Sequence, residues 1–376
     1  MIVSMGFYDL LGQYSWQDIE QQIEATTKAD VERAVANPHL KIENFIHLVS
    51  PAAEPYLEDM AQQAHRLTAQ RFGKVMSLFA PLYLSNMCTN SCQYCGFNIR
   101  NSVKRVTLSP DQAAEEGQYL YDQGFRHILL VSGEVPEIVS IPYLTEIVEK
   151  LRPMFASISI ELYPMLVEAY KTLITCGTDG LVIFQETYNR ERYADVHPRG
   201  RKRDYHWRLE TPERAGVAGF RRIGIGALLG LSSWRTEGFF LALHARYLLR
   251  HFWKSQVTIS FPRLQPSAGG YQAPHPVSDK NMVQLIIALR LFLPDVSLVL
   301  STRESPQLRD DLIPLGITTM SAGSRTDPGG YTQQCQAEEQ FEIADHRSAA
   351  IVADILSQKG YEPVWKDWDA MFLHEQ

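Results

Sequence analysis

The chain has 376 residues, of which 45% are hydrophobic, and it carries a formal net charge of −7. This composition fits one large globular domain or two ordinary ones, and the negative charge argues against a protein that binds nucleic acid through a basic face. No run approaches the roughly 18 consecutive apolar residues that a membrane span requires. The first residues lack the basic and apolar regions of a secretory signal, so we expect a cytoplasmic protein.

The N-terminal part of the chain has the apolar periodicity and the capping residues of helices. Ser15 precedes one such stretch as an N-cap, and Ser50 with Pro51 at the first helical position begins a longer stretch that ends at Gly73. No group of catalytic side chains stands out in this region of the sequence. We therefore predict that residues 1–75 form a helical extension that packs on the main domain.

From Leu78 onward, short runs rich in β-branched residues alternate with longer amphipathic runs. Strands that alternate with helices indicate βαβ units and a parallel sheet. Eight such repeats within about 250 residues predict an α/β fold, a TIM-type (β/α)₈ barrel that is complete or partly open. We place the barrel at residues 76–330 and a C-terminal segment that packs on it at residues 331–376. The predicted strands are 78–85, 127–133, 157–163, 180–186, 220–228, 256–261, 296–302 and 316–323.

Three of the five cysteines, Cys88, Cys92 and Cys95, lie directly after the first predicted strand with the spacing Cys-x-x-x-Cys-x-x-Cys. Three thiolates on one loop can hold three irons of a [4Fe–4S] cluster and leave the fourth iron open for catalysis. A zinc site or an electron-transfer cluster normally takes four protein ligands. Cys176 and Cys335 are distant in sequence and have no companion at ligand spacing, so we predict a catalytic cluster on the three-cysteine loop.

The segment CTNSCQYC resembles the signature of the radical S-adenosylmethionine (SAM) superfamily, and it follows a strand at the mouth of the predicted barrel. The resemblance implies that the open iron binds the amino and carboxylate groups of SAM. It also implies that the reduced cluster splits SAM to give a 5′-deoxyadenosyl radical. A reduced electron donor of the flavodoxin or ferredoxin type is implied as a partner.

The same resemblance implies contacts with SAM at the ends of successive strands. Tyr94 matches the aromatic residue beside the adenine, and Ser132 replaces the first glycine of the GGE motif that receives the methionine amino group. Acidic or amide side chains end the third and fourth strands, and glycines on the fifth strand let the adenine approach the backbone. The implied cofactor residues are Tyr94, Ser132, Gly133, Glu134, Glu161, Gln185, Ile225 and Gly226.

The whole chain resembles the 2-iminoacetate synthase family, the tyrosine lyases of thiamine thiazole biosynthesis. Matching stretches include FQETY (184–188), RKRDYHWRLETPERAGVAGF (201–220), SAGSRTDPGGY (321–331) and PVWKDWDA (363–370). The resemblance implies cleavage of the Cα–Cβ bond of L-tyrosine to 2-iminoacetate and p-cresol, with SAM consumed to 5′-deoxyadenosine and methionine. The imine is labile in water, so close transfer to thiazole synthase is also implied.

A tyrosine zwitterion inside a barrel needs a cation for its carboxylate. Arg303, at the end of the seventh predicted strand, offers a planar bidentate donor. Ser301 and Ser321 can add hydroxyl donors near the same mouth. Tyr188 fits either a pocket wall or the core, and a salt bridge between Arg303 and Glu304 is the alternative to substrate binding.

Two other functions remain open at this stage. The tyrosine lyase of hydrogenase cofactor maturation, which makes carbon monoxide and cyanide, shares the same core but carries further cysteines in a C-terminal extension. The sequence has no cysteine after Cys335, which argues against that function. An iron–sulfur or zinc protein without enzymatic activity is the alternative from another class.

Overall fold

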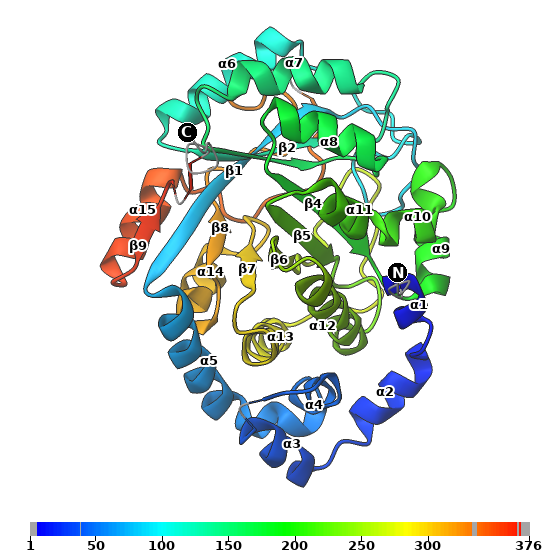
Figure 1. The fold of residues 1–376 in the computed structure, drawn as a ribbon, viewed down its shortest axis with the longest axis vertical. Helices are drawn as coiled ribbons and strands as arrows, with labels where there is room; N and C mark the ends of the chain where they lie inside the picture. Colours follow the sequence, from blue (N-terminus) through cyan, green and yellow to red (C-terminus); the bar gives the residue numbers. More distant parts are fainter. Residues whose placement is uncertain (1–5, 38, 333–336, 367, 370–376) are drawn as a thin grey trace.

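A computed structural model describes residues 6–37, 39–332, 337–366 and 368–369, so Cys335 lies outside the described residues. Eight parallel strands form a barrel with helices on the outside (Figure 1). The strands are β1 (Val75–Ser85), β2 (His127–Ser132), β3 (Ser157–Glu161), β4 (Gly180–Glu186), β5 (Arg222–Ala227), β6 (Gln256–Ser260), β7 (Ser297–Leu300) and β8 (Thr319–Ser321).

The first strand closes the barrel. It pairs with β2 over Ala80–Ser85 and with β8 over Ser77–Phe79, so every strand of the barrel has a neighbour on both sides. This confirms the predicted TIM-type barrel and settles that it is closed. The sequence analysis missed a short additional strand, β9 (Glu362–Val364), which pairs parallel with the first residues of β1.

The helices cover the outside of the barrel. Those that alternate with or follow the strands are α6 (Pro110–Asp122), α7 (Ile141–Leu151), α8 (Val167–Cys176), α9 (Arg190–Val196), α10 (Tyr205–Leu209), α11 (Thr211–Ala218), α12 (Trp234–His251), α13 (Asp279–Phe292), α14 (Pro306–Leu312) and α15 (Ala349–Gln358). None of the helices in the described part of the chain is long and apolar enough to cross a bilayer.

The N-terminal helices form a second layer outside the barrel helices. They are α1 (Phe7–Leu11), α2 (Trp16–Glu24), α3 (Lys28–Val35), α4 (Ile42–Leu48) and α5 (Leu57–Phe72). In Figure 1 they run past α12 and α13, and α2 and α5 contact these two helices respectively. The division of the chain into an extension, a barrel and a C-terminal segment stays a prediction.

One of the predicted N-terminal helices differs from the expectation. Ser15 caps α2 as predicted, with its hydroxyl accepting from the Asp18 amide. The helix predicted to begin at Pro51 is instead a 3₁₀ segment, Pro51–Tyr56, followed by α5. Pro55 lies inside that segment and cannot donate the backbone hydrogen bond of a regular α-helix, which explains why the α-helix begins only after it.

The apolar core lies between the strands and the helices rather than inside the barrel. Outward-facing residues such as Leu130, Ile160 and Ile259 are fully buried. Inward-facing residues such as Val182 and Val299 keep partial exposure and line an internal cavity. The interior of most barrels of this type is filled by layers of bulky side chains, so this barrel has an unusually open interior.

Candidate active site

The three-cysteine loop follows β1 and has no regular secondary structure of its own. One cation binds several carbonyls of this loop: Arg105 donates to those of Asn86, Phe97 and Asn98 at distances of 2.6–2.9 Å. The Asn98 side chain in turn donates to the carbonyl of Cys92 at 2.9 Å. Sequence reasoning missed Arg105, because a loop arginine has no distinguishing pattern until the loop's carbonyls are placed around it.

The end of β2 contacts the cluster loop directly. A Cβ atom on Gly133 would lie 2.2 Å from the carbonyl oxygen of Met87 and 3.0 Å from the Cβ of Cys88. Only glycine permits this approach. The next residue, Glu134, accepts a hydrogen bond from the Asn90 side chain at 2.7 Å, which ties the same strand end to the loop.

The three thiols suit a cluster. Cys88, Cys92 and Cys95 are free, and their charges interact with one another. Burial raises the pKa of Cys92 well above its usual range and that of Cys95 to about 11, so these two thiolates need positive metal charge to persist. The described residues contain no group of three His, Cys, Asp or Glu side chains that converges on a single ion. A cubane, whose irons occupy separate corners, fits this arrangement of thiols.

A cavity of about 340 Å³ occupies the interior of the barrel and is lined by residues from all eight strands. Four of the predicted site residues, Glu161, Ser301, Arg303 and Ser321, line its C-terminal end. This is the end at which catalytic residues of such barrels lie. The structure therefore brings together one carboxylate, one guanidinium and two hydroxyl groups predicted from separate strands.

Arg303 presents its cation to this cavity without a direct ion pair in the described part of the chain. Its guanidinium lies 3.3 Å from the centroid of the Phe341 ring, and within the described chain no hydrogen-bond acceptor contacts it. The alternative salt bridge with Glu304 does not form, because the Glu304 carboxylate accepts from Arg263 Nε at 2.9 Å. Burial lowers the pKa of Arg303, which a bound carboxylate would offset. The site is therefore suited to an anionic group.

A buried ion cluster lies beside Glu161. Glu186, the last residue of β4, binds Lys202 Nζ at 2.5 Å and lies 3.7 Å from Arg208. Burial raises the pKa of Glu186, but the two cations outweigh this effect and hold it below its ordinary value. Burial, followed by the neighbouring Glu186 charge, raises the pKa of Glu161 to about 7.

The assignment of Gln185 as a cofactor residue stays a prediction, and the structure places the next residue, Glu186, in the ion cluster. The strand is irregular between Phe184 and Glu186, and Glu186 adopts a φ of 72°. This bulge turns Glu186 towards the ion cluster. Both Gln185 and Glu186 are buried, and neither lines the internal cavity.

Tyr94 is held by a neutral histidine. Its hydroxyl lies 2.8 Å from His197 Nε2, and His197 Nδ1 lies 2.8 Å from the Tyr193 carbonyl. Burial, together with the Lys202 charge, lowers the pKa of His197 to about 3. Because Nδ1 must donate to the carbonyl, Nε2 accepts from Tyr94. Sequence reasoning missed His197 and Lys202, and only the likeness of the segment 201–220 to the family pointed near them.

Other predicted residues lie elsewhere. The Ile225 side chain is buried in the outer core, whereas Gly226, on the inward face, would bring a Cβ within 2.7 Å of the Ser260 carbonyl. The Ser132 hydroxyl donates to the backbone carbonyl of its neighbour Gly133 at 2.9 Å. Glu134, which is bonded to the cluster loop through Asn90, lines a second cleft with Tyr163 and Arg201 rather than the internal cavity.

Tyr188 does not line the internal cavity. Its hydroxyl lies 2.9 Å from His244 Nδ1, and its ring packs against Phe7 and Phe240. The side chain is only 3% exposed. Of the two interpretations made from the sequence, the structure therefore supports the core residue and separates Tyr188 from the substrate cation.

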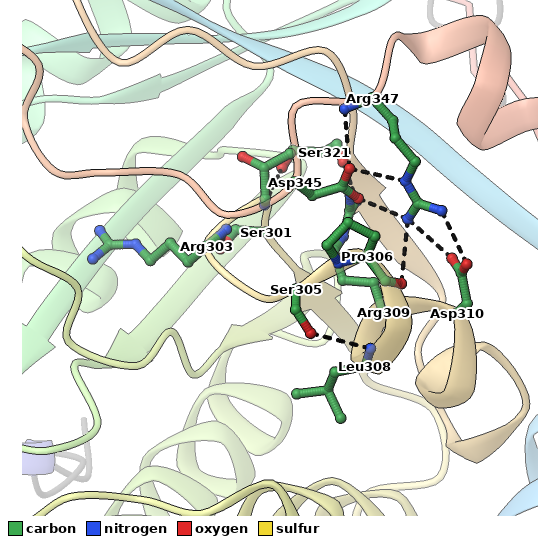
Figure 2. A network of polar contacts seen from close by, with 11 residues as sticks. Ser301, Arg303, Ser305, Pro306, Leu308, Arg309, Asp310, Ser321, Asp345 and Arg347 are labelled. Atoms are coloured by element: carbon green, nitrogen blue, oxygen red, sulfur yellow. Dashed lines mark hydrogen bonds and ion pairs between the residues drawn. The ribbon is translucent and has the colours of Figure 1, made fainter.

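A buried network holds the strand ends that carry Ser301, Arg303 and Ser321 (Figure 2). Arg309 donates to the Ser321 carbonyl and to the Asp345 carboxylate, both at short range. The Ser321 hydroxyl accepts from the Thr302 amide at 3.1 Å, and the Thr302 carbonyl accepts from the Asp345 amide at 3.1 Å. In Figure 2, Arg303 points away from this network, which leaves its guanidinium available to the cavity.

We expect the substitution Asp345→Asn to destabilise the protein by about 3–5 kcal/mol, because it leaves the fully buried Arg309 without its counter-charge. The free energy of unfolding from urea denaturation measures this loss. Asp310→Asn is the control, since Asp310 contacts only the outer cation Arg347 and is 23% exposed. Its expected cost is about 1 kcal/mol or less. Equal losses in the two variants would contradict the role given to Asp345.

Comparison with known proteins places this geometry in a family. Residues 82–237 match the family model of the radical SAM superfamily, and residues 260–362 match that of the biotin and thiamin synthesis associated domain. The chain is 46% identical to the 2-iminoacetate synthase of Salmonella typhimurium and 45% identical to that of Escherichia coli. Each alignment covers 97% of this chain and 97% of the relative.

The chain belongs to the 2-iminoacetate synthase family. It is therefore a radical SAM enzyme, and the [4Fe–4S] cluster and SAM are its cofactors. A solved structure of HydG, a maturase of the [FeFe]-hydrogenase, is also similar, with a TM-score of 0.88 and 30% identity. That match covers 95% of this chain and 83% of the maturase chain.

Proposed function

We propose that this 2-iminoacetate synthase family member cleaves the Cα–Cβ bond of L-tyrosine, giving 2-iminoacetate and p-cresol and consuming SAM to 5′-deoxyadenosine and methionine. The observation that carries the substrate assignment is Arg303, a half-buried guanidinium with no acceptor among the described residues, at the C-terminal end of the internal cavity. A half-buried cation without a hydrogen-bond partner favours an anionic ligand, and the α-carboxylate of tyrosine supplies one.

The residues divide into those that would hold the cofactors and those that would hold the substrate. Cys88, Cys92 and Cys95 would each bind one iron. When bound, the cluster and SAM supply the 5′-deoxyadenosyl radical that abstracts a hydrogen atom from the substrate. Tyr94, fixed by its histidine, and Glu186, fixed by two cations, would orient SAM beside the cluster loop.

On the substrate side, Arg303 would bind the carboxylate in a bidentate manner, and Ser301 would add a hydroxyl donor at the same strand end. Glu161 lines the same cavity, and its pKa of about 7 allows its carboxyl oxygen to take up or release a proton near neutral pH. The closed barrel wall separates the reacting atoms from bulk water, which protects a radical from side reactions.

Product analysis tests this function. With tyrosine, SAM and a reductant, the anaerobically reconstituted protein should form p-cresol and glyoxylate, the hydrolysed imine, in equal amounts. SAM cleavage without p-cresol would assign a different substrate. Absence of 5′-deoxyadenosine at full iron content would instead support an iron–sulfur protein without enzymatic activity.

The similarity to the HydG structure favours one second candidate, the tyrosine lyase of hydrogenase maturation. Both functions yield p-cresol, so the fate of the glycine-derived fragment separates them. Carbon monoxide, detected as its complex with deoxymyoglobin, would favour the maturase function. Glyoxylate without carbon monoxide would favour 2-iminoacetate synthesis.

Three further features are part of the proposal. A reduced flavodoxin or ferredoxin would supply the electron, and thiazole synthase would receive the labile imine. A cytoplasmic location of the enzyme completes the proposal. Co-purification with thiazole synthase would test the transfer of the imine between the two proteins. An unrelated barrel enzyme is the control and should not co-purify.

A further inference from the structure

A short C-terminal segment crosses the cluster loop. The Gly96 amide, next to Cys95, donates to the carbonyl of Gln340 at 2.9 Å. A Cβ atom on Gly96 would lie 2.4 Å from the Glu339 carbonyl oxygen and 2.8 Å from that of Gln340. The backbones of the segment and the loop are therefore in direct contact, and glycine is needed for it.

The side chain of Gln340 joins a cluster ligand to the cavity wall. Its Nε2 lies 3.9 Å from Cys95 Sγ, at hydrogen-bond distance for sulfur. Its Oε1 accepts from the hydroxyl of Tyr83 at 2.8 Å, and Tyr83 lines the internal cavity. Because the amide oxygen is engaged by a hydroxyl donor, the amide nitrogen is directed at the sulfur.

The neighbouring residue contacts the substrate cation. Phe341 places its ring under the Arg303 guanidinium, and its carbonyl accepts from Thr326 Oγ1 at 3.0 Å. The Gln340 amide donates to the Thr326 carbonyl at 3.0 Å, so both residues are anchored to the same loop. Two adjacent residues thus touch a cluster ligand and the residue that would bind the substrate carboxylate.

We propose that Gln340 is a positioning residue that donates a hydrogen bond to the Cys95 thiolate, and that it links the reduction potential of the cluster to occupancy of the cavity. Hydrogen bonds to cluster sulfurs stabilise the more negative, reduced state and raise the potential. A ligand that contacts Tyr83 or Arg303 changes the position of the Gln340 amide through the shared contacts. The link to the cavity rests on the proposed tyrosine site, whereas the hydrogen bond to Cys95 does not.

Two variants isolate the donor. Gln340→Glu keeps the side-chain length and the acceptor for Tyr83 but replaces the N–H donor by a carboxylate oxygen, and Gln340→Leu removes both groups. We expect the midpoint potential of the reconstituted cluster, measured by potentiometric titration monitored by electron paramagnetic resonance, to fall in both variants. Gln118→Leu is the matched control, since Gln118 is an exposed glutamine on α6, and its potential should equal that of the unaltered protein.

Iron content and the thermal midpoint show whether each variant has folded and kept its cluster. SAM cleavage at a fixed reductant potential should fall by about 10- to 100-fold, the usual effect of losing a partner of a metal ligand. An unchanged potential in Gln340→Glu and Gln340→Leu at full iron content would overturn the hydrogen bond to Cys95.

The link to the cavity has its own measurement. Saturating tyrosine should shift the potential of the unaltered protein, and the shift should be lost in Gln340→Leu. A shift that persists in Gln340→Leu would overturn the link while leaving the hydrogen bond intact. The potential is measured without turnover, so it is independent of whether the p-cresol assay supports the proposed reaction.

Discussion

Replacing any one of Cys88, Cys92 and Cys95 by alanine is expected to abolish SAM cleavage. Each of the three thiolates would hold a different iron, so two ligands cannot retain the cubane. Iron content after anaerobic reconstitution should fall from about four atoms per chain, and the absorption of the cluster in the visible range should disappear with it. The measured quantities are iron, sulfide and 5′-deoxyadenosine.

Cys176→Ala is the matched control for these variants. Cys176 ends α8 on the outside of the barrel and is half-buried, without a contact to the cluster loop in the described structure. This variant should keep the iron content and the SAM cleavage of the unaltered protein. If a single variant among the three cluster cysteines retained both properties, the assignment of that cysteine as a ligand would be wrong.

The substitution Arg303→Ala is expected to remove tyrosine cleavage while leaving slow, tyrosine-independent SAM cleavage. Truncating one partner of a buried charged hydrogen bond costs about 2–5 kcal/mol, so tyrosine should bind at least about 30-fold more weakly. Arg303→Lys keeps the charge but not the planar pair of donors. Its affinity for tyrosine should therefore lie between that of Arg303→Ala and that of the unaltered protein. The measurements are the p-cresol yield and the tyrosine concentration at half-maximal rate.

Arg250→Ala serves as the control for a general loss of positive charge, because Arg250 is exposed on α12, outside the barrel. It should leave both p-cresol and 5′-deoxyadenosine formation unchanged. If p-cresol formation by Arg303→Ala equalled that of the unaltered protein, Arg303 would have no place in the substrate site. The loss of SAM cleavage as well would indicate disruption of the cofactor site instead.

The fold could be predicted from the sequence because its signals are local and repeated. Each of the eight predicted strands overlaps a strand of the barrel, since β-branched runs bounded by turn residues specify strands without tertiary information. Only β1 extends beyond its predicted range, because it begins at Val75 rather than Leu78. The short strand Glu362–Val364 was not predicted, because three residues carry too little pattern. Its pairing partner, the start of β1, is also almost 300 residues away in the sequence. Closure of the barrel could not be predicted either, because it depends on the pairing of β1 with β8, which are distant in the sequence.

The sequence pointed to candidate site residues where an unusual chemical type stands at a strand end. Arg303, Glu161 and the cluster cysteines are of this kind. A sequence pattern does not show where the backbone departs from regular geometry, as it does between Phe184 and Glu186. Residues whose role depends on contacts between distant segments carry no local signal. Lys202 and Gln340 became visible only once the chain was folded.

The open interior of the barrel has a consequence for how the protein keeps its shape. A lumen lined by partly exposed side chains lacks the close packing that makes most barrels rigid, and its ligands supply the missing contacts. Saturation with a ligand at about one hundred times its dissociation constant adds about 2.7 kcal/mol to the folded state. We therefore expect saturating SAM or L-tyrosine to raise the melting temperature of this protein.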